Sequence, residues 1–328
     1  MKILVTGGLG FIGSNFILNL ITHNEDTKII NLDAGFYGSN PLNLSHLKIT
    51  DNYQFVKGNI CDQQLVDKLV SDSDSVINFA AESFVDRSIA NPKPFIDSNI
   101  IGVYTLLESI KKYKKKFLQV STDEVFGSLE STTASENFPF NPSSPYAATK
   151  ASAEMLVNSY YITYGCDTLI TRCTNNFGPR QFPEKLIPKI ILLLKQNKKI
   201  PVYGSGKNLR DWLYVIDHCK AINLVLEKGK SGSSYNISSN NEIDNLTIIK
   251  KILSIMNKSE NLIEFVEDRP GHDFRYSLNS DKLRNELNWK PVYQFEQGLT
   301  DTINWYLSNP EWCSSISSEI FGHLPWKK

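Results

Sequence analysis

The chain has 328 residues, 41% of them hydrophobic, which is enough to bury a core in one large unit or two unequal lobes. Lysine plus arginine and aspartate plus glutamate both number 35, so no net field draws the chain to nucleic acid or to an anionic membrane. Any binding of phosphate must be local. The five cysteines are odd in number and far apart, which argues against a disulfide framework and a metal site: Cys61, Cys166, Cys173, Cys219 and Cys313.

The N-terminus and the longest apolar run of the chain both predict a soluble protein. The opening residues MKILVTGG reach glycine too soon for the apolar core of a signal peptide. The longest aliphatic run, Ile190 to Leu194, is far too short to span a bilayer. Since the cysteine pattern fits a reducing compartment, we expect a cytoplasmic location.

Short β-rich runs alternate with helical stretches through the first half of the chain. This alternation predicts βαβ units and a doubly wound parallel sheet of the Rossmann type over 1–175, with a return segment near 213–237. The pattern then loosens, and we expect a smaller mixed α/β lobe over 176–328 with helices over 246–256 and 295–307. The predicted strands are Ile3–Val5, Ile29–Leu32, Phe55–Val56, Val76–Phe79, Phe117–Val120 and Thr168–Thr171.

The first predicted strand runs into a G-x-x-G-x-x-G turn that opens a helix. Glycine allows a tight turn and a close approach of the backbone, and a helix N-terminus offers N–H groups and partial positive charge to a pyrophosphate. A purely structural turn is the alternative, but the strand before and the helix after favour dinucleotide binding. The expected contacts are Gly7, Gly10, Phe11, Ile12 and Gly13.

The second predicted strand ends in Asp33, twenty residues after Gly13. A carboxylate at this place can accept hydrogen bonds from an adenosine ribose, and it would repel a 2′-phosphate. Asp33 therefore favours NAD over NADP. The alternative is an ordinary turn aspartate that follows a strand.

The stretch STDEVFG places two carboxylates, Asp123 and Glu124, directly after the strand that ends at Thr122. Adjacent carboxylates repel each other unless solvent screens them, and burial would raise the pKa of at least one toward neutrality. Within a regular strand they would point to opposite faces. The alternative interpretation, an ordinary strand end exposed to solvent, would then apply. If the strand has ended, both can serve one site.

The stretch SPYAATKASAEML contains a tyrosine and a lysine four residues apart. Pro145 suits a helix start, and Tyr146 and Lys150 then share one face. The pattern is also common as a packed ring beside an extended amine. Next to a dinucleotide, however, the ammonium and an oxidised nicotinamide would lower the pKa of Tyr146, which is ordinarily about 10. Tyr146 is therefore a candidate base for a sugar hydroxyl.

Together, TGGLGFIG, STDEVFG and YAATK resemble the extended short-chain dehydrogenase/reductase family, whose members act mostly on nucleotide sugars. Four further stretches are similar to its dTDP-glucose 4,6-dehydratase branch, and the resemblance covers nearly the whole chain. They are NFAAESFVDRSI, TRCTNNFGPRQFPEKLIPK, YGSGKNLRDWLYVIDHCKAI and EDRPGHDFRYSLN.

The resemblance implies an NAD-dependent loss of water. Tyr146 would deprotonate the hydroxyl at carbon 4 of the sugar while hydride moves to NAD, with Thr122 bonded to the same hydroxyl. Glu124 would then remove the proton at carbon 5, and Asp123 would protonate the departing hydroxyl at carbon 6. Return of the hydride to carbon 6 and of a proton to carbon 5 gives a 4-keto-6-deoxy sugar and regenerates NAD.

The resemblance also assigns the remaining contacts. Asn59, where the family commonly has Asp, and Ala80 would lie by the cofactor. Glu82 is expected near the sugar, and Arg210 would pair with phosphate, unless it forms an ion pair with Asp211. A structural role is the alternative for His272. The expected contacts of the substrate are Glu82, Asn175, Glu184, Lys185 and Arg210, with Asn245 and His272 at the nucleotide end.

Four positions depart from the family pattern. Phe84 replaces a usual His, Phe126 and Phe177 replace Tyr, and Arg180 replaces Tyr. None of them carries a proton in the reaction above. Phe84 and Arg180 lie in motifs expected to line the cleft, and the added guanidinium would alter the preference for sugar or diphosphate. The nucleotide, dTDP or UDP, is left open.

Two other functions are compatible with parts of the pattern. A UDP-sugar 4-epimerase needs only the Tyr–Lys pair and a hydroxyl. A sensor or scaffold that binds NAD(H) has no need of the full set of reactive residues, which is Thr122, Asp123, Glu124, Tyr146 and Lys150. The resemblance further implies a homodimer, because the helices expected over 93–113 and 146–164 carry apolar faces that pair in the family. No nucleic acid or membrane partner is expected.

Overall fold

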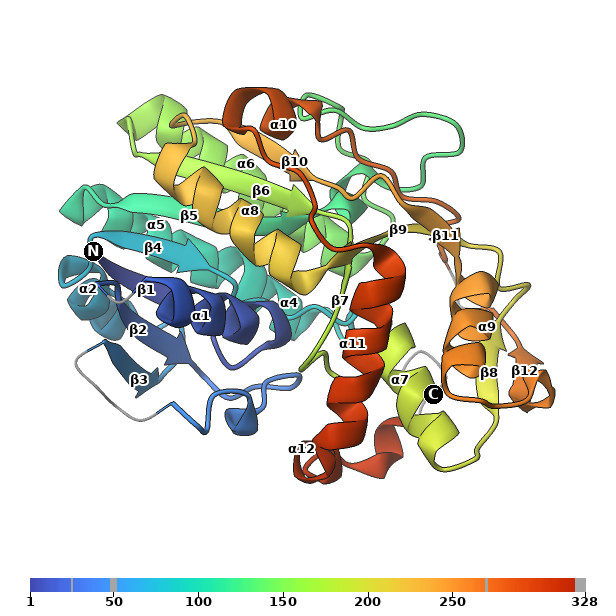
Figure 1. Cartoon of the computed structure of the whole chain (residues 1–328). Coiled ribbons are helices and arrows are strands. Elements are labelled where there is room, and N and C mark those ends of the chain that lie inside the picture. The colour runs from blue at the N-terminus through green and yellow to red at the C-terminus, as the bar shows by residue number, and fades with distance from the viewer. Residues whose placement is uncertain (25, 48–51, 269–270, 322–328) are drawn as a thin grey trace.

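The computed structural model describes residues 1–24, 26–47, 52–268 and 271–321. A large lobe is built on a seven-stranded sheet, and a smaller lobe lies beside the ends of its strands (Figure 1). The strands all run parallel in the order β3-β2-β1-β4-β5-β6-β10. They are β1 Lys2–Thr6, β2 Lys28–Asp33, β3 Tyr53–Lys57, β4 Ser75–Asn78, β5 Lys116–Thr122, β6 Thr168–Cys173 and β10 Ser234–Ile237.

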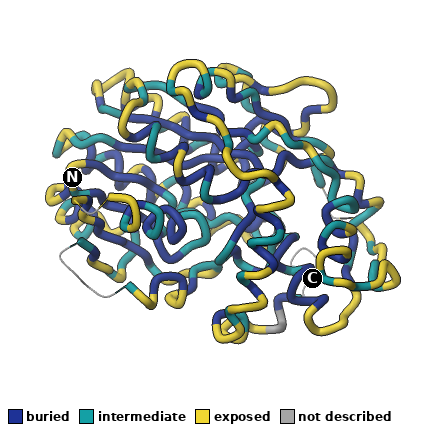
Figure 2. The backbone as a smooth tube through the Cα atoms, in the orientation of Figure 1, coloured by how far each residue is buried: buried dark blue, intermediate teal, exposed yellow. Residues whose placement is uncertain are grey.

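Helices cover both faces of this sheet. One face packs against α1, α8 and α10, with Phe16 and Ile222 in the core, and the other packs against α2, α5 and α6, with Leu106 and Val157. The sheet is the most deeply buried layer (Figure 2). The helices of the large lobe are α1 Phe11–His23, α2 Gln63–Ser71, α3 Val85–Ala90, α4 Lys93–Ile96, α5 Gly102–Tyr113, α6 Pro145–Tyr164, α8 Val215–Lys228 and α10 Asp281–Leu287.

The doubly wound Rossmann fold predicted from the alternating pattern is confirmed. All six predicted strands form, and five of them are runs largely buried on both sides, as a parallel sheet requires. The sixth, Phe55–Val56, lies in the edge strand β3, where Phe55 is 37% exposed. The return segment contributes α8 and then β10, which pairs with β6 at the edge of the sheet. A π turn over Asp97–Ile101 joins α4 to α5, so the predicted helix over 93–113 is nearly continuous.

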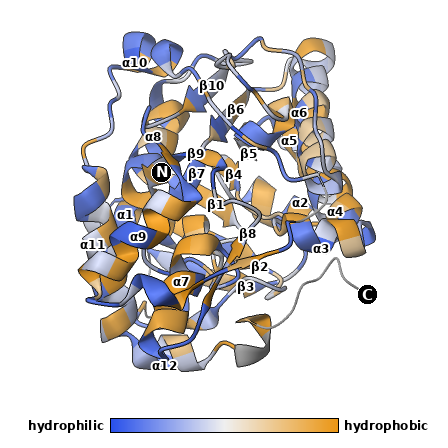
Figure 3. Cartoon of the chain, turned by 90° about the vertical axis from the view of Figure 1, so that its right-hand side faces the viewer, coloured by the Kyte–Doolittle hydropathy of each residue, from blue (hydrophilic) through white to orange (hydrophobic). Residues whose placement is uncertain are grey.

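The small lobe has its own core of aliphatic and aromatic side chains, including Ile191, Ile252 and Tyr306. Its helices carry both apolar and polar residues (Figure 3). The predicted helices over 246–256 and 295–307 form as α9 and α11. The elements are β7 Asn175–Phe177, β8 Ile200–Tyr203, β9 Leu209–Tyr214, β11 Glu242–Asp244, β12 Ile263–Val266, α7 Leu186–Lys195, α9 Asn245–Ile255, α11 Phe295–Ser308 and α12 Pro310–Ser314.

The topology creates a crevice between the lobes. The strand order reverses between β1 and β4, and in such sheets ligands bind outside the carboxyl ends of the strands at this point. None of the helices described is long and apolar enough to cross a bilayer. All five cysteines are free thiols.

Candidate active site

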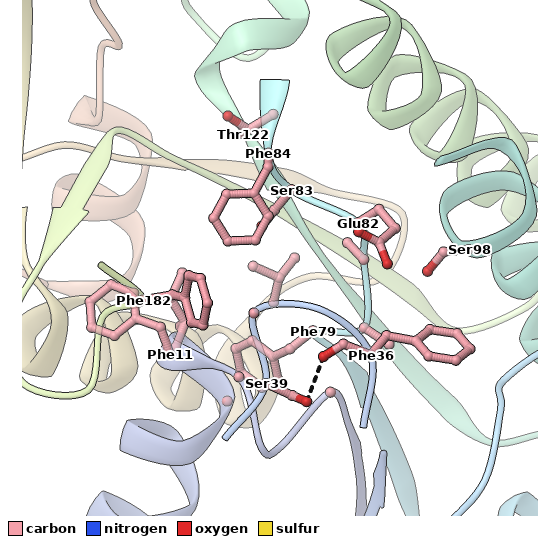
Figure 4. Close-up of a pocket in the computed structure, with 18 of the residues that line it drawn as sticks. Phe11, Phe36, Ser39, Phe79, Glu82, Ser83, Phe84, Ser98, Thr122 and Phe182 are labelled. Atoms are coloured by element: carbon pink, nitrogen blue, oxygen red, sulfur yellow. Dashed lines mark hydrogen bonds between the residues drawn. The ribbon is translucent and has the colours of Figure 1, made fainter. Parts of the chain in front are cut away.

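Two adjoining pockets occupy the crevice. The first pocket lies at the carboxyl ends of the strands of the large sheet, and the second lies between that edge and the small lobe. Phe84, Glu124, Asn175 and Lys185 line both. In Figure 4, Phe11 and Phe182 lie on one side of the first pocket, and Glu82 and Ser98 lie on the other.

Every residue predicted as a site residue lines one of these pockets. The first pocket holds Gly7, Gly10, Phe11, Ile12, Gly13, Asp33, Asn59, Ala80, Glu82, Thr122, Asp123, Glu124, Tyr146, Lys150, Asn175 and Lys185. The second holds Glu124, Asn175, Glu184, Lys185, Arg210, Asn245 and His272. Arg269 and Pro270 of the last family motif lie outside the described residues.

The glycine turn leaves no room for side chains. Gly7 has a φ of 73°, and a Cβ there would lie 2.6 Å from the backbone nitrogen of Ala80. At Gly13 a Cβ would lie 2.4 Å from the carbonyl oxygen of Gly7. No side chain of the described chain caps the start of α1, so the N-terminal N–H groups of this helix are suited to an anion.

Asp33 is buried at the end of β2 and shapes the loops around it. Its carboxylate accepts hydrogen bonds from the N–H groups of Leu9, at 2.9 Å, and Gly35, at 2.8 Å. Burial raises the pKa of Asp33, while these two hydrogen bonds act in the opposite direction. Asp33 thus combines the turn role and the position expected of a ribose ligand.

The two adjacent carboxylates lie beyond the regular strand. β5 ends at Thr122, and a 3₁₀ turn follows over Asp123–Phe126. The Thr122 hydroxyl starts this turn, because it accepts from the N–H of Glu124 at 3.3 Å and donates to Asp123 Oδ1 at 3.1 Å. The turn removes the strand alternation, so Asp123 and Glu124 both line the first pocket.

Asp123 is poised to carry a proton. Its side chain is buried, and among the described residues its Oδ2 has no hydrogen-bond partner. Burial, followed by the charge of Glu124, raises the pKa of Asp123 well above its ordinary value. A carboxyl group that stays protonated at neutral pH can act as a general acid.

Tyr146 and Lys150 are both buried on α6, but their electrostatics differ from the prediction. Burial lowers the pKa of Lys150 to about 8, and its ammonium donates to the carbonyl oxygen of Val120 at 2.7 Å. Burial, followed by the charge of Glu124, raises the pKa of Tyr146 well above its ordinary value. The expected lowering of the Tyr146 pKa by Lys150 is therefore wrong for this structure, because burial outweighs it and the charge of Glu124 acts in the same direction as burial.

Arg210 and Asp211 do not form the ion pair considered as an alternative. They are neighbours on β9, where consecutive side chains point to opposite faces. The Asp211 carboxylate accepts from the loop over 238–241, including the N–H of Asn241 at 3.0 Å. Arg210 lines the second pocket, where it donates to the carbonyl oxygen of Asp273 at 2.8 Å and lies over the ring of Tyr276.

Glu184 has partners within the protein. Its carboxylate pairs with Arg87 at 3.0 Å and accepts a hydrogen bond from the hydroxyl of Tyr37. Lys185 points to the other lobe as well, donating to the carbonyl oxygen of Ser83 at 2.9 Å. The segment predicted to hold the sugar and diphosphate therefore also ties the small lobe to the large one.

The other predicted contacts have mixed surroundings. His272 lines the second pocket and pairs with Asp268 at 2.6 Å through Nδ1, so its contact with the nucleotide stays a prediction beside this structural contact. Asn59 Oδ1 accepts from the N–H of Cys61 at 2.9 Å. Burial raises the pKa of Glu82. Within the described residues the buried Oδ1 of Asn175 has no hydrogen-bond partner, which leaves it available to a ligand.

Of the four departures from the family pattern, only Phe84 lines the pockets. Phe84 forms a wall of both pockets and packs edge-on against Tyr37. Phe126 and Phe177 are core side chains. Arg180 lines neither pocket, and its guanidinium carbon lies 5.4 Å from the ring centroid of Trp305, so the expected effect on substrate preference is not supported.

Sequence reasoning missed several residues of the site. Cys173, at the end of β6, lines the first pocket, and burial raises the pKa of its thiol to about 12. Tyr37 and Arg87 hold Glu184, and Tyr276 lies beneath Arg210 in the second pocket. Their positions in the chain could have identified two of them. Cys173 follows the predicted strand Thr168–Thr171 closely, as Thr122 follows the strand before it, and Tyr37 lies in the loop that follows Asp33.

Comparison with known proteins agrees with this geometry. Residues 4–302 match the GDP-mannose 4,6 dehydratase family, and the chain belongs to this family of nucleotide-sugar enzymes. The chain is 44% identical to the dTDP-glucose 4,6-dehydratase of Xanthomonas campestris over 95% of each chain. The structure of the dTDP-glucose 4,6-dehydratase of Bacillus anthracis in complex with NAD has a TM-score of 0.90 and 47% identity, covering 95% of this chain and 98% of its own. The corresponding Streptomyces venezuelae enzyme has a TM-score of 0.93 and 40% identity, with the same coverage. The resemblance predicted from the motifs is confirmed.

Proposed function

We propose that this protein is an NAD-dependent dTDP-glucose 4,6-dehydratase that produces a 4-keto-6-deoxy sugar nucleotide. One observation carries the proposal. The 3₁₀ turn after β5 brings Asp123 and Glu124 into the pocket that also contains Thr122, Tyr146 and Lys150. An acid and a base on adjacent atoms are what elimination of water requires. The similarity to dTDP-glucose 4,6-dehydratases supports the same activity.

The first pocket fits NAD. The glycine turn lets a pyrophosphate approach the N-terminus of α1, Asp33 suits the ribose, and Asn59 and Ala80 line the same pocket. Bound NAD would supply a reversible store for the hydride of carbon 4, which is returned at carbon 6. Because the cofactor is regenerated in each cycle, tight retention is expected.

Tyr146 and Lys150 serve the oxidation at carbon 4. As phenolate, Tyr146 takes the proton of the sugar hydroxyl and becomes a neutral phenol, and Thr122 holds that hydroxyl in place. Because burial raises the pKa of Tyr146, this phenolate requires positive charge beside it, which an oxidised nicotinamide would supply when NAD is bound. The buried Lys150 ammonium supplies positive charge next to this proton transfer.

Glu124 and Asp123 serve the elimination. The ketone at carbon 4 acidifies the hydrogen at carbon 5, and the Glu124 carboxylate removes it. Asp123, whose pKa is raised by burial, protonates the hydroxyl that leaves carbon 6. The charge of Glu124 thus helps to raise the pKa of Asp123, so Glu124 acts as the base and Asp123 as the acid.

The second pocket is suited to the nucleotide diphosphate. Arg210, Lys185 and Lys189 supply positive charge. Asn245 and His272 line the same pocket, and we assign them to the nucleotide end. UDP-glucose is the alternative substrate, because uracil and thymine differ by one methyl group. A UDP-sugar 4-epimerase or an NAD(H)-binding scaffold would leave Asp123 and Glu124 without a task.

The proposed division of the chain is an NAD-binding domain over 1–175, which includes a return segment near 213–237, and a substrate domain over 176–328. We also propose a cytoplasmic homodimer. The free thiols fit a reducing compartment. Exposed apolar side chains on α4 to α6 support pairing of these helices: Ile96, Ile101, Tyr104, Met155 and Ile162.

The test is the turnover of purified protein with dTDP-glucose, followed by mass spectrometry, with Tyr146→Phe alongside. The wild type should convert the substrate to a product lighter by one water, and the variant should lose most of this activity. Interconversion of a UDP-sugar without loss of water would favour the epimerase. Binding of NAD without turnover of any sugar nucleotide would favour the scaffold.

A further inference from the structure

A third buried residue of α6 continues the line of the reactive side chains. Tyr146, Lys150 and Glu154 are spaced by four residues, so they lie along one stripe of the helix. Glu154 is 1% exposed and lines neither pocket. A carboxylate at this depth requires a partner.

Its partner is Arg172 of β6, which is also buried. The Arg172 guanidinium contacts Glu154 Oε2 through Nη2, at 2.7 Å, and through Nε, at 2.8 Å. In the sheet, Arg172 is in register with Ser121, immediately before Thr122. The pair therefore joins the helix that carries Tyr146 to the strands that lead into the pocket.

Arg172 also reaches the turn that carries the two carboxylates. Its guanidinium carbon lies 5.0 Å from the ring centroid of Phe126, the last residue of the 3₁₀ turn, and 5.4 Å from that of Phe140. Its Nη1 donates to the carbonyl oxygen of Glu136 at 3.0 Å. One side chain thus contacts the catalytic helix, the carboxylate turn and the loop beside them.

The charge of Glu154 acts on Lys150 as well. Burial lowers the pKa of Lys150, and Glu154, one turn further along α6, opposes this effect most strongly, followed by Cys173. The other titratable or charged groups around the lysine are Tyr146 on the same helix, Arg172 on β6, and Asp123 and Glu124 on the turn after β5. A buried ion pair often adds no net stability over apolar residues of the same volume, so its contacts point to a positioning role.

We propose that Glu154 and Arg172 form a positioning pair for the dehydratase reaction. The pair holds the Tyr146–Lys150 face of α6 in register with the turn that carries Asp123 and Glu124, and the Glu154 carboxylate keeps Lys150 in its ammonium form. This inference rests on the proposed function, since it assigns the pair to that site.

The test compares Glu154→Gln with the wild type across pH. Glutamine keeps the size and one acceptor but removes the charge, so the ammonium of Lys150 is lost at lower pH. We expect kcat above neutral pH to fall about tenfold and the alkaline limb of the kcat profile to move down by about one pH unit, with KM little changed. Lysine NMR titration of NAD-bound protein should show the same shift of the Lys150 pKa without any turnover.

Matched variants separate this role from a structural one. Glu242→Gln breaks another arginine–carboxylate pair, with Arg275, that lies outside both pockets, and it should leave the pH profile unchanged. The double variant Glu154→Gln, Arg172→Gln should regain thermal stability relative to Arg172→Gln, yet keep the displaced alkaline limb. A lower Tm for Glu154→Gln with an unchanged pH profile and an unchanged Lys150 titration would overturn the proposal. Lack of turnover by the wild type, with the NMR shift present, would instead contradict only the proposed function.

Discussion

Arg87 of α3 and Glu184, just before α7, form an ion pair of 3.0 Å that joins the two lobes. The Arg87 guanidinium carbon also lies 3.5 Å from the ring centroid of Tyr37, whose hydroxyl donates to the same carboxylate. Tyr37 belongs to the loop that follows Asp33, so the proposed cofactor loop and the proposed sugar-binding segment are held by one cluster. We therefore expect retention of the cofactor to depend on the position of the small lobe.

Replacing Arg87 with methionine should loosen this cluster. The variant keeps much of the apolar volume but loses the ion pair and the cation over the Tyr37 ring. We expect NAD to be lost during gel filtration of the variant, and KM for the sugar nucleotide to rise about tenfold. The bound NAD is measured from the absorbance of the protein after denaturation.

Lys251→Met is the control for Arg87→Met. It breaks an exposed ion pair with Glu296 in the small lobe, away from both pockets. Its NAD content and KM should match the wild type. Equal retention of NAD by the Arg87 variant would show that the lobes are not coupled through this cluster.

Asp123→Asn should stabilise the protein while impairing it. Burial raises the pKa of Asp123 in the folded state above its unfolded value of about 4. The folded state therefore binds the Asp123 proton more tightly than the unfolded state. The stability gained in this way is complete below the unfolded pKa and is lost as pH rises through the folded pKa. Asparagine can accept the same hydrogen bond from Thr122 and does not ionise. The Tm difference in favour of the variant should therefore grow from pH 5 to pH 8, while water loss from the sugar slows at least a hundredfold. A Tm difference that is independent of pH would contradict the raised pKa.

His218 predicts a specific sensitivity to acid. It is fully buried on α8, neither ring nitrogen has a hydrogen-bond partner among the described residues, and burial lowers its pKa to about 3. The unfolded state binds a proton below about pH 6.5 and the folded state does not, so stability falls as pH drops from there toward 3. Near pH 4.5 the cost is about 3 kcal/mol.

The comparison is between His218→Leu and the wild type, measured by urea denaturation at pH 7 and at pH 4.5. The variant should lose less stability than the wild type between these two values. His23→Leu, at the exposed end of α1, should behave as the wild type. An equal loss in all three proteins would mean that His218 is protonated in the folded state.

The homodimer is tested on α6. Met155 is 55% exposed, and a charge at this position would be buried by pairing of the helices. Met155→Glu should therefore shift the mass from dimer to monomer in light scattering. Ile255→Glu, on the exposed side of α9, should not alter the mass. A monomeric wild type would refute the dimer.

The part of the fold that the sequence predicts is the part governed by local patterns. The buried strands are short apolar runs, and Pro145 marks the start of α6; in the structure the Ser144 side chain caps this start by accepting from the N–H of Ala147. The glycine turn, the carboxylates and the Tyr–Lys pair are each contiguous in the chain. Parallel strands bring their ends together, so their meeting in one pocket follows from the fold class.

Contacts between distant segments were not predictable in this way. Nothing in the local sequence indicates that Glu184 meets Tyr37 and Arg87, because 147 residues separate Tyr37 from Glu184. The pKa of Tyr146 was predicted in the wrong direction for a similar reason. Burial and the carboxylates of another element decide it, whereas the i, i+4 spacing showed only Lys150.

The most direct test of the account is mass spectrometry of the products formed by wild type and Glu124→Gln from dTDP-glucose and, separately, from UDP-glucose. The variant preserves the size of the side chain but removes the proposed base for carbon 5. The account predicts that the wild type removes one water from dTDP-glucose and acts poorly on UDP-glucose, and that the variant loses this activity while still binding NAD. Absence of water loss from either substrate by NAD-bound wild type, or full activity of the variant, would contradict it.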